Sequence, residues 1–319
     1  MSYLFATAGL IFLFVGGESL VRGAVITADR LGVSPILIAF VVVGFGTSAP
    51  ELVVCLEAAF RDQPDIALGN VVGSNIANIL LILGIAAIVR PLVLRNGFMR
   101  RDNAAMVIAT LVLVALGLYG RILAWQGLLM IAALGGYLVF SLWCDRREAG
   151  QQSFVEHEME EMRSLSLGPK LALLALFGGL GLLILGSHLL VGGAIEIAVS
   201  FGIPQAVIGL SLVAIGTSLP ELATAVIASY RGHPDVALGN VLGSNVFNIL
   251  GMLGVTALVT QVPIGATMLR VDFMVMLAAA LLLALLLVSK RTMRAPLGAA
   301  MVAAYGAYIY FIFTGYSAL

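Results

Sequence analysis

Two acidic residues, Glu51 and Glu221, lie inside long apolar stretches of the sequence, each directly after a proline. They belong to nearly identical motifs, "GTSAPEL" at 46–52 and "GTSLPEL" at 216–222. Burying an ionisable group deep in a membrane is costly, so such a residue marks a functional site by default. Apart from Arg22 near the end of the first stretch, these stretches hold no Lys or Arg at depth. Two carboxylates without basic partners therefore predict a cation site.

The prolines before the glutamates predict a break in each helix. Proline lacks an N–H and clashes with the carbonyl four residues earlier, so Pro50 and Pro220 should free the carbonyls of Gly46 and Gly216. Broken helices at membrane depth use freed carbonyls to hold ions. Hydroxyl residues add oxygen atoms beside each break: Thr47, Ser48, Thr217 and Ser218.

A polar stripe follows in the next apolar segment of each half. Positions i, i+4 and i+8 lie on one helix face, and in both halves these positions read Asn, Ser, Asn. The six residues are Asn70, Ser74, Asn78, Asn240, Ser244 and Asn248. We interpret the stripe as ion-coordinating, with hydrogen bonding between helices as the alternative. For Asn75 and Asn245 the hydrogen-bonding role alone is sufficient.

The expected ligands are all oxygen atoms from carboxylates, amides, hydroxyls and carbonyls. Such ligands suit hard cations, including Ca²⁺, Na⁺ and Mg²⁺, and disfavour Zn²⁺ and Cu⁺. Two glutamates carry a charge of −2, which one Ca²⁺ would neutralise. Two or three Na⁺ could use the same oxygens, so the two ions should compete, and competition is the physical basis of exchange. We expect these ions as cargo and no cofactor.

The composition predicts an integral membrane protein. Of 319 residues, 61% are hydrophobic and 11% charged, and the mean hydropathy is +1.08, whereas soluble domains are about half apolar and a quarter charged. Zero net charge gives no indication of a nucleic-acid partner. Alternating strand patterns are absent, so helices are expected. A span requires roughly 20 residues, and ten apolar segments fit this length, although those at 104–119 and 272–289 are somewhat short. The ten segments are 3–25, 33–60, 66–89, 104–119, 123–143, 169–198, 203–229, 236–260, 272–289 and 296–316.

The two halves of the sequence repeat each other. A shift of 170 residues aligns 37–84 with 207–254 without a gap, and 25 of these 48 positions are identical. Each repeat holds five predicted spans, and because five is odd the halves must cross the membrane in opposite directions. The predicted fold is an all-α membrane protein of ten transmembrane helices in two inverted five-helix repeats. Its parts are 1–143, a cytoplasmic linker at 144–168, and 169–319.

The basic residues predict an orientation. Of the 17 Lys and Arg, thirteen fall in one set of loops and three in the opposite set. The excess marks the cytoplasmic side. Both termini should then lie outside a cell membrane, the inner or plasma membrane, with the 144–168 loop in the cytoplasm.

Both motifs closely resemble those of the calcium/cation antiporter superfamily, in particular its sodium/calcium exchanger branch of bacterial and archaeal type. The resemblance spans the whole chain. It implies that Glu51 and Glu221 are central ligands for Ca²⁺ and Na⁺. It implies further ligands in both repeats: the carbonyls and hydroxyls of Thr47 and Thr217, Ser74 and Ser244 with the backbone oxygens of Gly44 and Ala214, and the middle pair Asn78 and Asn248.

The same resemblance bears on the coupling ion and the motion. Potassium-dependent members carry Asp where this chain has Asn248, which argues against K⁺ dependence. The proton-coupled branch typically has Gly-Asn where this chain has Thr47-Ser48, which favours Na⁺ over H⁺. The family also implies that spans 1 and 6 slide across the other eight. The glycines at 16–17, 23 and 192–193 suit such a surface, and packing alone would explain them equally well.

The leading hypothesis is a monomeric Na⁺/Ca²⁺ antiporter that works by alternating access. A Ca²⁺/H⁺ antiporter could use the same glutamates, and a cation channel is a less favoured alternative. An enzyme is not expected. A serine hydrolase would need a serine–histidine pair at depth, and His188 is the only histidine within a predicted span.

Overall fold

The computed structural model describes residues 2–31, 33–93, 97–149, 168–200, 214–289 and 291–315. Within them, eight helices are long and apolar enough to cross a membrane, and a bent helix pair makes a ninth span. The protein is therefore a multi-pass helical membrane protein. The predicted segment 203–229 starts outside the described residues, so ten spans stay a prediction.

The described residues of the first half form ten helical elements in sequence. They are α1 (Ser2–Leu31), α2 (Pro35–Ile38), the π-helical η1 (Ala39–Val43), α3 (Gly44–Thr47), α4 (Ala49–Phe60), α5 (Pro64–Ala77), π-helical η2 (Asn78–Ile82), α6 (Leu83–Val89), α7 (Gly97–Tyr119) and α8 (Ala124–Ala149). The segment expected at 104–119 is longer than predicted, because α7 continues through its basic N-terminal end. Helix α8 extends six residues into the predicted linker, most of which lies outside the described residues.

The second half repeats this order. It contains α10 (Pro169–Ser200), α12 (Ala214–Thr217), α13 (Leu219–Tyr230), α14 (Pro234–Val246), π-helical η5 (Phe247–Met252), α15 (Leu253–Val259), α16 (Ala266–Arg270), α17 (Asp272–Val288) and α18 (Ala295–Gly315). Two short strands, β1 (Arg121–Ile122) and β2 (Val262–Pro263), pair antiparallel and join turns of the two halves. They are the one sheet among the described residues and a small exception to the expected all-α fold.

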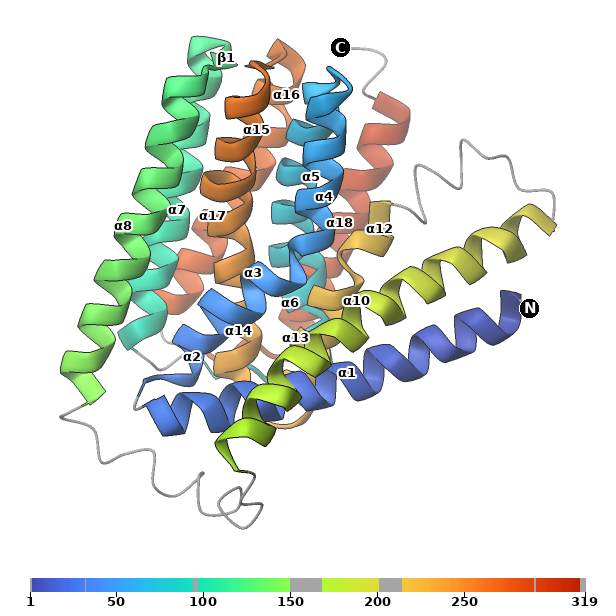
Figure 1. Ribbon diagram of the computed structural model, residues 1–319. Helices are drawn as coiled ribbons and strands as arrows, with labels where there is room; N and C mark the ends of the chain where they lie inside the picture. Colours follow the sequence, from blue (N-terminus) through green and yellow to red (C-terminus); the bar gives the residue numbers. More distant parts are fainter. Residues whose placement is uncertain are drawn as a thin grey trace.

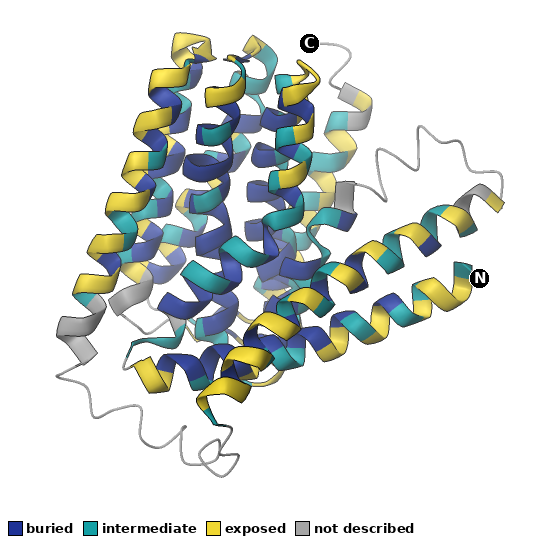
Figure 2. Ribbon diagram, viewed as in Figure 1, coloured by how far each residue is buried: buried dark blue, intermediate teal, exposed yellow. Residues whose placement is uncertain are grey.

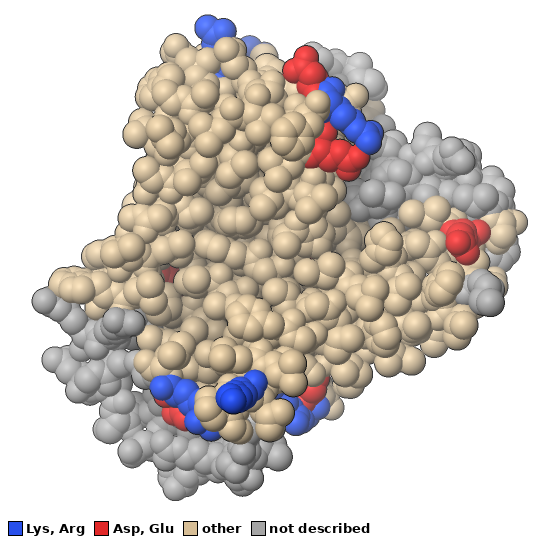
Figure 3. Space-filling model, in the orientation of Figure 1, with Lys and Arg blue, Asp and Glu red and all other residues tan. Residues whose placement is uncertain are grey.

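The helices form an upright bundle and an oblique pair. In Figure 1, α1 and α10 lie side by side and cross the bundle at a steep angle to the other helices. The helices that continue through π-helical segments, Pro64–Val89 and Pro234–Val259, are mostly buried, and Figure 2 shows α14 and α15 in the dark interior. In Figure 3, Lys and Arg lie towards the two ends of the visible face, and the broad band between them shows neither, as expected for a surface that crosses a bilayer.

Glycine allows α1 and α10 to approach very closely. A Cβ on Gly9 would lie 2.7 Å from the carbonyl oxygen of Gly186, and one on Gly16 would lie 2.9 Å from that of Gly179. The glycines recur every seven residues on both helices, so they fall on one face. Small residues at this spacing let two backbones touch, and packing contacts of this kind drive helix association in lipid.

These contacts give a specific role to the glycines of the first and sixth predicted spans. A Cβ on Gly23 or Gly193 would also lie within 3 Å of backbone atoms of the paired helix. Gly17 instead faces the side chain of Ile227 on α13. Most of these glycines therefore hold α1 and α10 together, and few face the bundle over which the pair was expected to slide.

An ion-paired glutamate joins the oblique pair to the bundle. Both carboxylate oxygens of Glu18 on α1 are engaged, one with Arg22 Nε and the other with Arg231 Nε, each at 2.5 Å. Arg231 directly follows α13, so the contact ties α1 to an end of that helix. All three side chains are partly exposed, and the pairing should contribute little to stability.

The close glycine contact makes a matched prediction on α10. Gly179→Ala places a methyl group 2.5 Å from the backbone nitrogen of Leu20, and such overpacking costs about 1–3 kcal/mol. Gly178→Ala is the control, because nothing lies within 4 Å of its Cβ position. We expect Gly179→Ala alone to lower the thermal unfolding midpoint of the detergent-solubilised protein. Equal midpoints for the two variants would contradict the close packing.

Candidate cation site

Each glutamate of the repeated motif lies in the first turn of a helix that follows a break. Glu51 belongs to α4 and Glu221 to α13, and both helices carry proline at their second position. In the first half, the helices on either side of Ser48 are bent by 50°, so Pro50 acts as predicted. Both carboxylates are about 1% exposed. The break thus places a charged group at the start of a buried helix.

Serines from opposite halves hold the two carboxylates. The hydroxyl of Ser48 donates to Oε1 of Glu221 at 2.8 Å, and that of Ser218 donates to Oε1 of Glu51 at 3.2 Å. The bonds are crossed, so each half supplies the donor for the acid of the other. They bring the two breaks together, and each glutamate keeps Oε2 buried with no hydrogen-bond partner among the described residues.

Asparagines repeat the crossed arrangement one helix away. Asn78 donates through Nδ2 to Oδ1 of Asn245 at 2.9 Å, and Asn248 donates to Oδ1 of Asn75 at 3.0 Å. Asn75 and Asn245 therefore form interhelical hydrogen bonds, as predicted. Because the donor atoms of Asn78 and Asn248 are used in this way, their Oδ1 atoms are left buried and without a described partner.

These contacts leave four buried acceptor oxygens, one from each of Glu51, Glu221, Asn78 and Asn248. Buried polar atoms are nearly always satisfied, so each exception needs an explanation. Four acceptors on symmetry-related residues, two of them carboxylate, fit a hard cation. No group of three or more His, Cys, Asp or Glu side chains in the described part of the chain could hold a metal. The candidate site therefore combines two carboxylates with several neutral oxygen atoms.

The first asparagine of each stripe makes interhelical hydrogen bonds, which the sequence left open as the alternative to ion coordination. Asn70 donates to the carbonyl oxygen of Glu51 at 3.4 Å, and Asn240 donates to that of Glu221 at 3.3 Å. Asn240 also accepts a hydrogen bond from Thr47 at 3.2 Å. These asparagines hold the backbone of the broken helices in both halves. Periodicity placed them on the correct face but did not identify this contact.

Ser244 and Gly44 lie together as expected. The serine hydroxyl donates to the Gly44 carbonyl oxygen at 3.0 Å, across the two halves. Ser74 is buried in the corresponding place on α5. Thr217 is half-buried beside the second break, and Ala214 begins α12, although its side chain lies outside the description.

One contact beside the second break was not predicted. The Gly216 carbonyl, which Pro220 deprives of a helical partner, accepts a hydrogen bond from Ser187 on α10 at 2.6 Å. The residue 170 positions earlier is Gly17, which has no hydroxyl. The two halves therefore differ here. The feature of the sequence that could have indicated this contact is that one repeat has serine where the other has glycine, within a loosely matching segment.

Paired helix breaks and buried oxygens from both halves are features expected of a membrane transporter of small cations. The family model of the sodium/calcium exchanger protein matches residues 1–143 and 171–314. CaxA of Alkalimonas amylolytica is 37% identical over 292 residues, covering 90% of this chain and 89% of its own. The inner membrane protein YrbG of Escherichia coli is 36% identical, covering 89% of both chains.

A solved structure of the sodium-calcium exchanger NCX_Mj, soaked with zero Na⁺ and Ca²⁺, matches with a TM-score of 0.85 and 28% identity, covering 98% of each chain. The chain belongs to the sodium/calcium exchanger family. It is therefore a cation exchanger and not an enzyme, as the sequence motifs predicted.

The crossed asparagines generate a stability prediction. Asn245→Ala removes the acceptor of Asn78 and leaves a buried donor unsatisfied, which costs about 1–3 kcal/mol. We expect a lower thermal unfolding midpoint in detergent. The control is Thr110→Val, because the buried Thr110 hydroxyl donates to Met106 within its own helix. An Asn245→Ala midpoint no lower than that of the control would show that the crossed bond carries no stability.

Proposed function

We propose that the protein exchanges Ca²⁺ for Na⁺ across the membrane at a site formed by both halves. The observation that supports this most is the set of four buried, unpartnered oxygens of Glu51, Glu221, Asn78 and Asn248. The proposed ligand set also includes the motif hydroxyls and carbonyls, from Thr47, Thr217, Ser48, Ser218, Ser74, Ser244, Gly44 and Ala214.

Charge and geometry explain how such a site would exchange ions. Ca²⁺ accepts six to eight oxygen ligands in flexible geometry, and it balances the charge of two ionised glutamates. Na⁺ ions that occupy the same oxygens would balance that charge only in pairs or more. Binding of one ion type therefore excludes the other. Suppose that the site changes the side of the membrane to which it opens only when bound cations balance the charge of the glutamates. Ca²⁺ moving one way is then exchanged for Na⁺ moving the other way.

The proposed motion is alternating access by two inverted five-helix repeats. Alternating access in such repeats is largely rigid-body movement around a fixed site. The glycine-packed pair of α1 and α10 would move as one body relative to the bundle, and the contacts of Glu18 with Arg231 and of Ser187 with Gly216 would change during that movement. We place both termini outside the inner or plasma membrane and the linker in the cytoplasm.

The transport assay uses proteoliposomes loaded with Na⁺ and diluted into Na⁺-free buffer that contains Ca²⁺. We expect Ca²⁺ uptake that depends on the outward Na⁺ gradient. Uptake driven by a pH gradient alone would assign the protein to Ca²⁺/H⁺ exchange instead. Uptake that needs neither gradient would indicate a channel.

Charge-neutralising variants test the site itself. Glu51→Gln and Glu221→Gln should each reduce the uptake rate by about a hundredfold or more, because each removes a buried charge from the ligand set. Glu57→Gln is the matched control, since Glu57 is exposed and pairs with Arg61 at the surface. Full uptake by either site variant would refute the proposed ligands.

A further inference from the structure

Two buried methionines lie behind the crossed asparagines. Nδ2 of Asn245 donates a hydrogen bond to the sulfur of Met106 on α7 at 3.4 Å. In the symmetry-related position, Nδ2 of Asn75 donates to the sulfur of Met276 on α17 at 3.9 Å. The two methionines are 170 positions apart in the sequence, so they occupy equivalent places in the two repeats, and both are buried. Each half therefore supplies a sulfur atom to an asparagine of the other half.

Each sulfur atom begins a chain of hydrogen bonds that ends at the candidate cation site. Met106 accepts from Asn245, and Oδ1 of Asn245 accepts from Nδ2 of Asn78. The Oδ1 of Asn78 is one of the four buried acceptors without a described partner. The symmetry-related chain from Met276 has the same order and ends at Oδ1 of Asn248. Both chains thus lead from a thioether through two amides to an unpartnered oxygen atom.

The sulfur atom sets the direction of its chain. A thioether can accept a hydrogen bond but cannot donate one, whereas an amide side chain carries both a donor and an acceptor. Beside Met106, Asn245 therefore turns its Nδ2 towards the sulfur and its Oδ1 towards Asn78. Asn78 must then present Nδ2 to Asn245, which leaves its own Oδ1 for the site. Hard cations bind oxygen atoms, so an acceptor at one end of the chain produces a cation ligand at the other.

The two chains differ in how far they depend on sulfur. Nδ2 of Asn75 also donates to the backbone carbonyl oxygen of Asn245 at 3.3 Å. A carbonyl oxygen is likewise only an acceptor, so it fixes the orientation of Asn75 even without Met276. For Nδ2 of Asn245, the sulfur of Met106 is the one hydrogen-bond acceptor among the described residues. Loss of the sulfur should therefore release only the chain that ends at Asn78.

From these contacts we infer that Met106 is a positioning residue for the transported cation, because its sulfur keeps Oδ1 of Asn78 directed to the ion. The inference rests on the proposed cation site, to which it adds a residue that determines affinity without touching the ion. Without the sulfur, the amide of Asn245 can turn over and offer Nδ2 to Asn78. Asn78 would then turn over as well and present N–H groups to the ion. N–H groups repel a cation, so the site would bind it more weakly.

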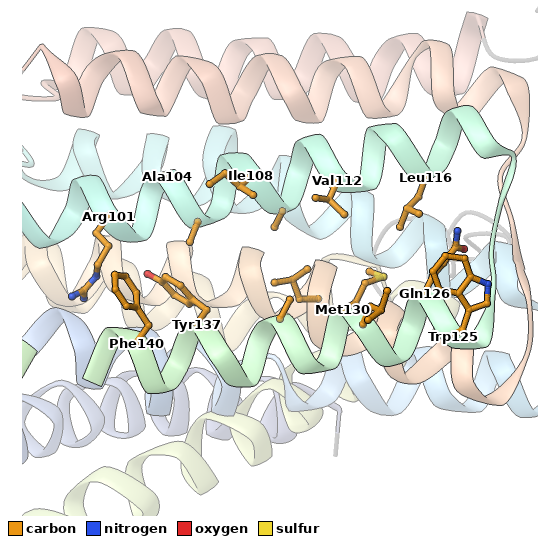
Figure 4. Close-up of a pocket in the computed structure, with 15 residues that line it drawn as sticks. Arg101, Ala104, Ile108, Val112, Leu116, Trp125, Gln126, Met130, Tyr137 and Phe140 are labelled. Carbon is orange, nitrogen blue, oxygen red and sulfur yellow. The ribbon is translucent and has the colours of Figure 1, made fainter. Parts of the chain in front are cut away.

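Replacement by leucine separates this role from simple packing. Methionine commonly fills gaps in a core, and an exchange for leucine, which has a similar volume, is usually tolerated. Met106→Leu removes the acceptor, and Met276→Leu is the matched control, because Asn75 keeps the carbonyl of Asn245. Met130→Leu is a second control, since Met130 of α8 belongs to neither chain. Figure 4 shows it in the largely apolar groove between α7 and α8.

Isothermal titration calorimetry with Ca²⁺ tests the inference on the full-length protein in detergent and Na⁺-free buffer. We expect Met106→Leu to raise the Kd for Ca²⁺ by about tenfold, the lower end of the range for mutations of residues that support metal ligands. Met276→Leu and Met130→Leu should keep the wild-type Kd. The thermal unfolding midpoints of the three variants should be similar, which would separate the loss of affinity from a loss of stability.

Met106→Gln provides the rescue. Its side chain has a similar length, and its amide oxygen can accept a hydrogen bond from Asn245. The Kd for Ca²⁺ should therefore lie nearer to that of the wild type than to that of Met106→Leu. This variant also carries the test if Met106→Leu does not fold. A Kd close to that of the wild type would support the inference, and a Kd about tenfold higher would overturn it.

The remaining outcomes separate the inference from the proposed function. A Kd of Met106→Leu no higher than that of Met276→Leu would show that the sulfur only fills space, and the inference would fail. A wild-type protein that does not bind Ca²⁺ would refute it together with the site on which it rests. If the wild type binds Ca²⁺ but shows no Na⁺-driven uptake, the proposed exchange fails, and the Kd values still decide the role of Met106.

Discussion

The fold depends on how two glutamates are stabilised in a bilayer, since neither forms an ion pair with a Lys or Arg among the described residues. A carboxylate in a medium of low dielectric constant needs compensating donors or a cation. Here Ser48 and Ser218 satisfy one oxygen of each acid across the two halves, and the second oxygen is left available. The helix breaks, the crossed asparagines and the burial of α5 and α14 all help to hold each carboxylate with one oxygen hydrogen-bonded and the other available.

Much of the site could be predicted because its sequence is duplicated. The repeat identified the paired glutamates, and proline chemistry identified the break at Ser48, since both depend on local rules. The role of Asn70 and Asn240 could not be predicted in the same way. An i, i+4, i+8 pattern defines a helix face but not whether an amide on that face meets an ion or a backbone carbonyl. Ser187 was missed for a related reason, because its partner, the Gly216 carbonyl, is far away in sequence.

The extents of the helices illustrate a second limit of the sequence. Hydropathy marks the part of a helix in the hydrocarbon core, whereas hydrogen bonding continues into the polar interface. Helix α7 accordingly begins at Gly97, before two arginines, and α8 ends at Ala149, inside the charged segment. The glycine pairing of α1 with α10 also required coordinates, because a seven-residue glycine spacing does not specify which helix lies opposite.

The crossing of hydrogen bonds between halves also bears on biosynthesis. When the first five spans emerge from the ribosome, Ser218 and Asn245 have not yet been made, so Glu51 and Asn78 lack the partners that they have in the folded protein. The first half therefore cannot complete its polar interior alone, and it must tolerate water or a temporary partner until the second half inserts. Assembly of the interior is consequently a late event in which two halves that entered the membrane separately close on each other.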